Sequence, residues 1–538
     1  MNARKILCLM AAVLMLSGCS KGVDGSQASS KAAESSDKAD SSISDYDNTT
    51  TEPETDKPEF DLNDSVIGFS QESGFYDSGF SLELTANEGE KIYYTTDGTD
   101  PRTSATREEY TAPIEIKDRS NDPNVVSAVP TEMISGNFNE FSFGEGDFWC
   151  NKKAPSDNAV DKCTVIRASS EKSDGSVSQS FSGSFYIGSA EEHIKGLKES
   201  CEAAGHDLAV MNITMDYADL FDSKIGIYVK GDIFNKALED YKASGESIEN
   251  ETARQLDANY KQRGKEWERD CHIELNEISA EGNVTNALSQ DCGIRIQGNY
   301  SRSDLQKGFR LYARKKYGEK KFNYEVFEGL KNASDETIDS FKTLTLRAGG
   351  NCAFTAKFND TYWQSLMTEL DGSTKASRPC VVYLNGEYWG LYVLEEDYSD
   401  NYFESHYGVN KDDVVVYKGD AETYQSGYKL DEGKLPEGET DEGYFFKELT
   451  DFFASHKDLS AQADYDEFSK LVDTDSVRDY FLAEVWINNK WDWPGKNWSM
   501  WKVQNTDSSN EYADGRWRFM FYDVEFGGVS GEGDAWTN

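Results

Sequence analysis

The fold is indicated most directly by residues 379–394, which read PCVVYLNGEYWGLYVL. Two apolar, strand-forming runs, 379–384 and 389–394, flank the dipeptide Asn385-Gly386. An Asn-Gly pair between such runs favours a tight β-hairpin, because both residues accept the positive φ angles of that turn. The stretch therefore predicts two adjacent antiparallel strands in a sheet.

Other strand-forming runs precede this hairpin, and most segments with helical periodicity follow it. Short apolar runs predict strands at residues 208–213, 272–275, 293–296 and 308–311. Apolar residues three and four positions apart predict helices within 357–370, 444–453 and 477–488. Because strands dominate the first part and helices the second, we expect residues 189–538 to form one α+β domain.

Residues 60–188 have a different pattern, in which apolar and polar residues alternate over short runs. Such alternation predicts half-buried strands, and the stretch DGTDP at 97–101 is typical of a turn between two of them. Two longer runs, 164–168 and 180–187, predict a further pair of strands. We therefore expect a small all-β sandwich in front of the α+β domain.

The first residues predict export. Two basic residues precede an apolar run over 6–15, which is too short to cross a bilayer of about 30 Å as a helix and is typical of a signal peptide. The run ends in LSGC at 16–19, which is similar to a lipobox. We expect residues 1–18 to be removed and Cys19 to carry a lipid that anchors the protein to the extracytoplasmic face of a bacterial cell membrane. An ordinary signal peptide with an incidental cysteine is the alternative.

Composition sets further limits on structure and partners. Residues 19–59 are rich in Ser, Asp, Glu and Thr and contain few large apolar residues, so we expect a disordered stalk. The chain has 98 acidic and 55 basic residues and a net charge of −43. This negative charge favours solubility and argues against binding to nucleic acid.

The chain contains nine cysteines. Once the cysteine of the signal peptide and the lipidated one are set aside, an odd number remains, so at least one thiol is free or pairs with another molecule. The candidate disulfides within the chain are Cys271–Cys292 and Cys150–Cys163. No C-x-x-C spacing or histidine cluster predicts a zinc site.

Three polar residues in the second half suggest phosphoryl transfer. Asp492 and Asn497 form a D-x-x-x-x-N pattern, and Asp523 ends the apolar run 518–522 before a glycine-containing loop. Phosphoryl transfer needs a carboxylate that orients the attacking hydroxyl and oxygen ligands that hold Mg²⁺ over the phosphates. Lys307, on a strand-forming run, is placed to supply a cation for the phosphates. This order of lysine, aspartate with asparagine, and aspartate is the order found in protein kinases.

Longer motifs support the same interpretation. They are GIYVKG at 226–231, GIRIQGNYSR at 293–302, LRAGGN at 346–351, YLNGEYWGLY at 383–392 and YDVE at 522–525. Through these motifs, residues 208–538 resemble the spore-coat-protein-H (CotH) family of atypical protein kinases. Residues 60–188 resemble the chitobiase C-terminal-like domain, a fibronectin-type-III-like module, through GFY at 74–76, YYTTDGT at 93–99 and VIRA at 165–168.

The CotH resemblance implies a reduced protein-kinase-like fold and a Mg²⁺-dependent transfer of phosphate from ATP to Ser or Thr hydroxyls of proteins. It implies that Asp492 is the catalytic base or a metal carboxylate, and that Asn497 and Asp523 bind Mg²⁺. It also implies that Lys307 binds the nucleotide phosphates. Two arginines are secondary phosphate ligands or, equally, members of structural salt bridges; these are Arg302 and Arg295.

The sequence departs from the family pattern in three respects. Cys352 and Asn359 stand where the family usually has Asp and Arg, and loss of the arginine removes a bidentate partner for a carboxylate. The chain also ends at Asn538, so we expect the kinase-like domain to be incomplete at its C-terminus. Separately, Glu395 and Glu396 are expected at the solvent-exposed surface, with the adenine edge of the nucleotide as the alternative.

These observations leave two main functions open. The first is a surface-anchored atypical protein kinase that acts on exported or surface proteins. The second is a catalytically degenerate adhesion or scaffold protein that binds a protein or a glycan and uses the β-sandwich as a spacer or glycan contact. A glycosidase with two carboxylates is a third interpretation, which the CotH resemblance disfavours.

Overall fold

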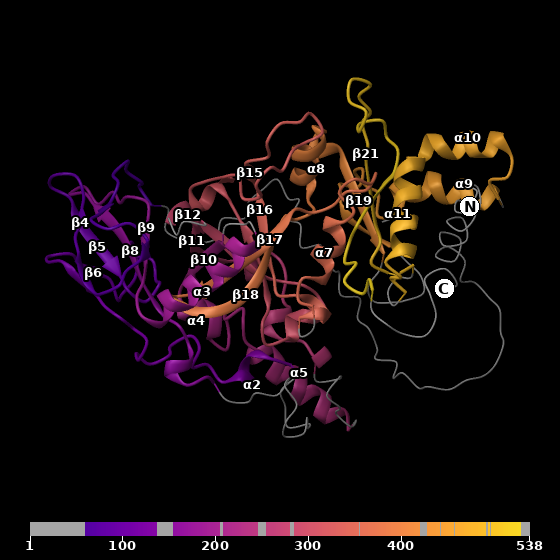
Figure 1. Cartoon of the computed structure of the whole chain (residues 1–538). Coiled ribbons are helices and arrows are strands. Elements are labelled where there is room, and N and C mark those ends of the chain that lie inside the picture. The colour runs from indigo at the N-terminus through magenta and orange to yellow at the C-terminus, as the bar shows by residue number, and fades with distance from the viewer. Residues whose placement is uncertain are drawn as a thin grey trace.

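The computed structural model describes residues 60–136, 154–204, 208–245, 254–279, 284–353, 356–419, 428–441, 443–456, 458–490, 493–494 and 496–528. The predicted signal peptide, the predicted lipidation site Cys19 and the predicted stalk lie outside these residues. Figure 1 shows three parts side by side: an indigo β-sandwich, a barrel, and a part in orange and yellow that combines helices with a sheet. The predicted α+β class with an N-terminal β-sandwich is confirmed.

The N-terminal part is the predicted β-sandwich. Its main sheet has the strand order β2-β9-β8-β5-β6, and the pairs β1-β4 and β3-β7 complete it. Its core contains the buried side chains of Leu82, Ile166 and Phe185. The strands are β1 (Gly68–Phe69), β2 (Gly74–Phe75), β3 (Phe80–Leu82), β4 (Leu84–Thr85), β5 (Lys91–Thr95), β6 (Glu108–Glu109), β7 (Ile114–Ile116), β8 (Cys163–Glu171) and β9 (Phe181–Tyr186).

Seven strands of the central part close into a barrel in the order β10-β11-β12-β13-β16-β18-β17. The parallel pairing of β10 with β17 closes the barrel, whereas the predicted hairpin joins β17 to β18. Asn385 and Gly386 have φ angles of 48° and 79°, as a tight Asn-Gly turn requires. The strands are β10 (Leu208–Thr214), β11 (Arg269–Ile278), β12 (Val284–Gln297), β13 (Gly308–Tyr312), β16 (Thr343–Arg347), β17 (Ser377–Leu384) and β18 (Glu387–Glu395).

The C-terminal part packs helices against a four-stranded sheet. The strand order is β20-β19-β21-β22, formed by β19 (Val414–Gly419), β20 (Tyr428–Glu432), β21 (Ser499–Val503) and β22 (Arg518–Met520). Its core is aromatic, with Tyr480 stacked on Phe519 at a centroid distance of 4.2 Å. The helices are α8 (Asp400–Tyr407), α9 (Lys447–Ser455), α10 (Gln462–Leu471) and α11 (Thr474–Trp486).

Short elements connect these parts. Helix α7 (Asn359–Ser365) has seven residues, about two turns, and is shorter than the helix predicted within 357–370. The remaining elements are α2 (Thr131–Ile134), α3 (Ser189–Ala204), α4 (Tyr217–Phe221), α5 (Gly231–Ser244), β14 (Phe322–Asn323) and β15 (Ser340–Phe341). Among the described residues, no helix has the length and apolar character needed to cross a membrane.

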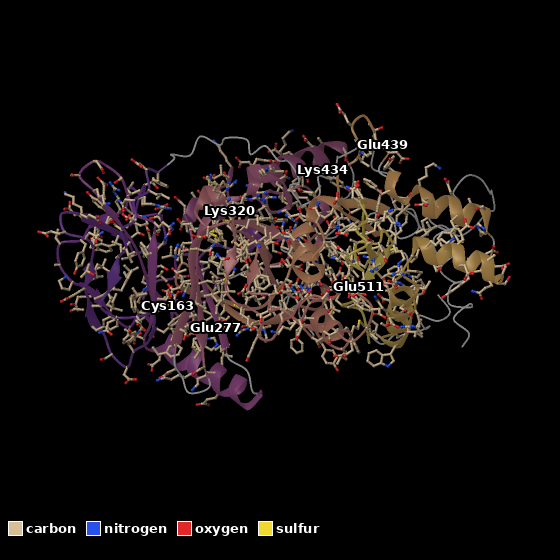
Figure 2. The ribbon with its side chains drawn as sticks, turned by 90° about the horizontal axis from the view of Figure 1, so that it is seen from above. Cys163, Glu277, Lys320, Lys434, Glu439 and Glu511 are labelled. Carbon is tan, nitrogen blue, oxygen red and sulfur yellow. The ribbon has the colours of Figure 1, made fainter. Side chains whose placement is uncertain are left out.

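The cysteine positions agree only partly with the predicted disulfides. Cys271 and Cys292 face each other across β11 and β12 with their Sγ atoms 3.4 Å apart, and both are free thiols. Cys163 is a buried thiol where the sandwich meets the barrel (Figure 2), and its Sγ lies 3.6 Å from Oδ1 of Asn212. Its predicted partner, Cys150, lies outside the described residues.

Candidate functional site

The site is built around Asp523, which follows β22. Its backbone has a φ angle of 54°, and Asn497, just before β21, has a φ angle of 57°. Left-handed backbone is uncommon for residues other than glycine, although Asn and Asp tolerate it best, and it occurs preferentially where a side chain must be aimed at a site. The two predicted metal ligands therefore share an unusual backbone conformation.

The structure brings these two side chains together. Nδ2 of Asn497 donates a hydrogen bond of 3.2 Å to Oδ2 of Asp523. Asn497 is 8% exposed, whereas the Asp523 side chain is 29% exposed and so is open to a ligand from solvent. Asp492, the third residue of the predicted group, lies outside the described residues.

Arg347, at the end of β16, links Asp523 to two further carboxylates. Nη2 of Arg347 lies 2.7 Å from Oδ1 of Asp523 and 3.0 Å from Oε2 of Glu525, and Nη1 lies 3.3 Å from Oδ2 of Asp360 in α7. Oδ1 of Asp360 accepts a hydrogen bond of 2.8 Å from the backbone N–H of Val524. One guanidinium group thus connects the barrel, α7 and the segment that carries Asp523.

The three carboxylates that contact Arg347 carry more negative charge than its guanidinium group can neutralise, and most of this charge is buried. Burial and the charge of Asp523 raise the pKa of Glu525 to about 7, although Arg347 opposes this rise. Burial also acts to raise the pKa of Asp360, but Arg347, Lys375 and two hydrogen bonds together outweigh it and hold that pKa below its usual value. Burial acts to lower the pKa of Arg347, but the carboxylates raise it well above its usual value.

The raised pKa of Glu525 predicts a pH dependence of stability. Between pH 5 and 7, Glu525 keeps its proton in the folded state. In the unfolded chain the same glutamate, with a pKa of about 4.3, has released it. The free energy of unfolding should therefore fall by about 1–3 kcal/mol as the pH rises from about 5 to about 8. Urea unfolding of the wild type and Glu525→Gln at several pH values measures this contribution, because the variant lacks it. Parallel profiles for the two proteins would contradict the assignment.

The positions that depart from the family pattern stabilise the segment after Asp523. The Asn359 side chain donates to the carbonyl oxygens of Glu525 and Gly527, the latter at 3.1 Å. The Cys352 Sγ lies 3.4 Å from the carbonyl oxygen of Glu525. Asn351, in the turn Gly350–Cys352, donates from Nδ2 to Oε1 of Glu525 at 2.7 Å. Arg347 provides a cation for Asp360, so this carboxylate is paired although Asn359 stands where the family usually has Arg.

Lys307 has a local role in the described structure. It is fully buried, and its Nζ donates to the carbonyl oxygens of Arg302 at 2.7 Å and Asp304 at 2.6 Å. Burial of the ammonium group lowers its pKa well below the usual value. These bonds fix the turn Tyr300–Ser303, which lies beside the turn Gly350–Cys352. Among the contacts of the described residues, Arg347 supplies a cation to Asp523, at 2.7 Å.

The two secondary phosphate candidates also have structural partners. Nη1 of Arg302 donates to the carbonyl oxygens of Tyr260 at 3.3 Å and Gln262 at 3.1 Å. Nη2 of Arg295 lies 2.9 Å from Oε2 of Glu268. For Arg295, the structure therefore shows the salt bridge that the sequence left as one of two alternatives.

The expectation that Glu395 and Glu396 are solvent-exposed is wrong. Both are buried, with Oε1 of Glu395 2.7 Å from Nζ of Lys375 and Oε1 of Glu396 2.8 Å from Nε2 of His406. The predicted strand ended at residue 394, whereas β18 continues to Glu395, and the partners that bury both carboxylates come from distant parts of the chain or the next helix. Sequence reasoning also assigned no role to Arg347 or to Glu525, although both lie within the motifs LRAGGN and YDVE.

Asp523 and Asn497 fit a magnesium site of the kind that proteins complete with substrate. They offer carboxylate and amide oxygens, the ligands that Mg²⁺ prefers, and Mg²⁺ commonly takes one or two protein groups together with phosphate oxygens. Within the described part of the chain, no group of three or more His, Cys, Asp or Glu side chains is arranged to hold a metal by itself. The nucleotide phosphates would therefore have to complete the coordination.

A β-barrel joined to a helix-rich part, with a carboxylate–amide pair where they meet, is consistent with a kinase-like domain. Residues 294–534 match the family model of the CotH kinase protein, and residues 71–129 match that of the chitobiase/beta-hexosaminidase C-terminal domain. The chain therefore contains a CotH kinase domain preceded by a chitobiase-like domain, as the sequence motifs predicted. No curated protein matches this chain.

Proposed function

We propose that this protein is a Mg²⁺-dependent atypical protein kinase that transfers phosphate from ATP to Ser or Thr hydroxyls of exported or surface proteins. The observation that carries the proposal is the contact between Asn497 and Asp523, both in left-handed conformations, beside Arg347. The CotH kinase domain supports it independently.

In this proposal, Asp523 and Asn497 hold the metal ion through oxygen atoms. When bound, Mg²⁺ neutralises the charge of the phosphates that develops during transfer. Arg347 positions the Asp523 carboxylate through its contact with Oδ1, and Asn497 contacts the other oxygen, Oδ2. Asp492 takes the role of the residue that orients the attacking hydroxyl, as the family resemblance implies.

The lipid on Cys19 places this activity at the membrane surface. A lipidated N-terminal cysteine and a stalk would hold the folded domains outside the cell, close to exported protein substrates. Incorporation of a labelled fatty acid that depends on Cys19 tests the anchor, and equal labelling of Cys19→Ser would contradict it.

One observation favours a second candidate, a catalytically degenerate scaffold that binds a protein or a glycan. Arg347 already lies in contact with Asp523 and Glu525, so the protein itself neutralises part of the charge that a metal would bind. A scaffold would retain this network without transferring phosphate.

Removal of the metal separates the two candidates. The full chain is incubated with ATP labelled in the γ-phosphate and a mixture of exported proteins, with Mg²⁺ or with EDTA. We expect protein-bound label with Mg²⁺ and a loss of about a hundredfold or more with EDTA, since the metal stabilises charge in the transition state. Absence of label under both conditions, with the chain folded, would favour the scaffold.

A further inference from the structure

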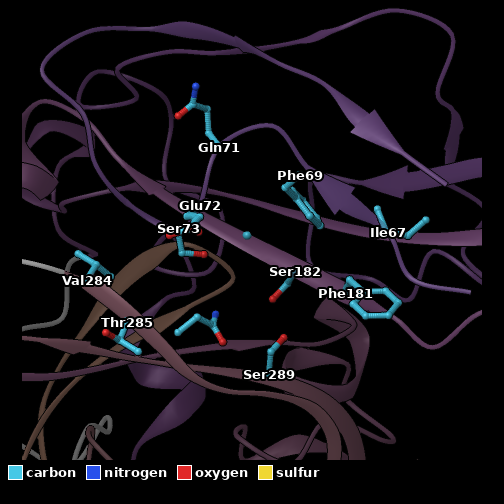
Figure 3. Close-up of a pocket in the computed structure, with 12 residues that line it drawn as sticks. Ile67, Phe69, Gln71, Glu72, Ser73, Phe181, Ser182, Val284, Thr285 and Ser289 are labelled. Carbon is cyan, nitrogen blue, oxygen red and sulfur yellow. The ribbon is translucent and has the colours of Figure 1, made fainter.

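A groove with a volume of about 530 Å³ lies between the β-sandwich and the barrel, remote in sequence from the Asp523 site. Figure 3 shows the side chains that line it, from the segment around β1, from β9 and from the start of β12. Two parts of the protein thus contribute opposite walls, and boundaries of this kind are common places for small-molecule sites.

The lining residues have a distinctive composition. Six carry neutral hydrogen-bonding side chains: Gln71, Ser73, Ser182, Thr285, Asn286 and Ser289. Among the described residues that line the groove, Phe69 and Phe181 supply aromatic surface, Glu72 is the one carboxylate, and there is no lysine, arginine or histidine. Without a cation, the lining does not suit a phosphate or carboxylate ligand, and six polar side chains do not suit a purely apolar one.

We infer that this groove binds a neutral saccharide of one or two sugar units. Hydroxyl and amide side chains both donate and accept hydrogen bonds, as sugar hydroxyls do, and aromatic rings pack against the apolar C–H faces of sugar rings. The volume lies within the range of small-molecule sites, about 300–1,000 Å³. This inference is independent of the proposed kinase activity.

Hydrogen bonds inside the protein already orient two of the serine hydroxyls. Ser182 donates from Oγ to Oε2 of the buried Glu274 at 2.7 Å, which leaves the oxygen of Ser182 to accept a bond from a ligand. Ser73 Oγ accepts a bond of 3.1 Å from the backbone N–H of Ser184, which leaves its proton to donate. Because these two hydroxyl oxygens are already held in place, less conformational entropy is lost when a ligand binds to them.

Gly183 keeps the groove open beside the aromatic rings. A Cβ at this position would lie 2.9 Å from Cζ of Phe185 and 3.3 Å from Cδ1 of Phe69, so a larger residue would shift the ring of Phe185 and crowd that of Phe69. The position of the aromatic rings therefore depends on a residue without a side chain at Gly183, which lets the backbone of β9 lie close to them.

A buried ionic network fixes the two walls relative to each other. Asp291, in the barrel, lies 2.5 Å from Nη2 of Arg102 and 3.1 Å from Nη2 of Arg167, both of which belong to the sandwich. It also lies 2.8 Å from Nδ1 of His272, whose Nε2 is 3.2 Å from the groove residue Ser289. An apolar cluster across the same boundary includes Tyr186 and Tyr383. The groove is therefore a fixed feature of the protein.

Titration of the full chain with neutral and anionic oligosaccharides tests the inference. The probes are the disaccharides of glucose, mannose and N-acetylglucosamine, with digalacturonate as the anionic comparison, and binding is measured by calorimetry. We expect at least one neutral probe to bind and digalacturonate to bind at least tenfold more weakly. Phe181→Ala and Asn286→Ala should each raise the Kd about tenfold, through loss of ring contact and of hydrogen bonding, respectively.

Two controls make the result decisive. Phe358→Ala removes a phenylalanine that is 57% exposed and does not line the groove, so it should leave sugar binding unchanged. Asp523→Ala should also leave it unchanged, which separates this inference from the kinase proposal. The inference is overturned if no neutral probe binds, if Asn286→Ala binds as the wild type does, or if peptides compete for the groove and sugars do not.

Discussion

Replacement of Arg347 by methionine is expected to lower the free energy of unfolding by about 3–5 kcal/mol, the range found when one partner of a buried ionic network is removed. Arg347 lies within hydrogen-bonding or ion-pair distance of Asp360, Asp523 and Glu525. Methionine fills a similar space but leaves three carboxylates close together without their shared cation. Urea unfolding at pH 7 measures the change.

Surface ion pairs provide the matched control. The Arg478 side chain is 43% exposed and lies near Asp475 and Asp479. Arg478→Met removes the same kind of charge at a solvent-exposed position, where the partner Asp475 is also exposed, so its effect should stay within about 1 kcal/mol. Equal effects of the two substitutions would show that Arg347 does not hold the carboxylate network together. Arg347→Lys should give an intermediate loss, because lysine keeps the charge but not the fork of donors.

Local sequence signals account for a large part of the fold. Asn385-Gly386 predicted the hairpin because the turn needs only residues that accept positive φ, and alternating apolar residues predicted the β-sandwich. The closure of the barrel could not be predicted in this way. It depends on parallel pairing between β10 and β17, which lie far apart in the sequence and whose pairing has no local signature.

The candidate site, like the fold, was predicted only where a local pattern marks its residues. The spacing and order of Asn497 and Asp523 identified two residues that prove to be in contact. The bond between Arg347 and Asp523 joins residues 176 positions apart, and periodicity carries no information about such a contact. Lys307 was assigned to nucleotide phosphate from its place on a strand-forming run and from the family resemblance, whereas its burial depends on how the preceding turn folds around its amine.

Asp523→Ala is expected to reduce phosphate transfer by about a thousandfold, the scale seen when one group that stabilises charge in a transition state is removed. The substitution removes one of the two proposed metal ligands and also the partner of Asn497. It relieves negative charge around Arg347, so the protein should remain folded, and the free energy of unfolding should change little or increase. The activity loss would then not arise from unfolding.

The matched control for this substitution is Asp335→Ala. Asp335 also has a left-handed backbone, with a φ angle of 63°, but it is solvent-exposed and lies outside the site. Its replacement should leave transfer within about twofold of the wild type, since surface substitutions have small effects.

The rate of Mg²⁺-dependent transfer from γ-labelled ATP in a single turnover, compared between wild type, Asp523→Ala and Asp335→Ala, is the most direct measurement. If Asp523 and Asn497 hold the metal-bound nucleotide, only Asp523→Ala loses about three orders of magnitude. Transfer by folded Asp523→Ala at a rate within threefold of the wild type would show that the phosphate is transferred elsewhere.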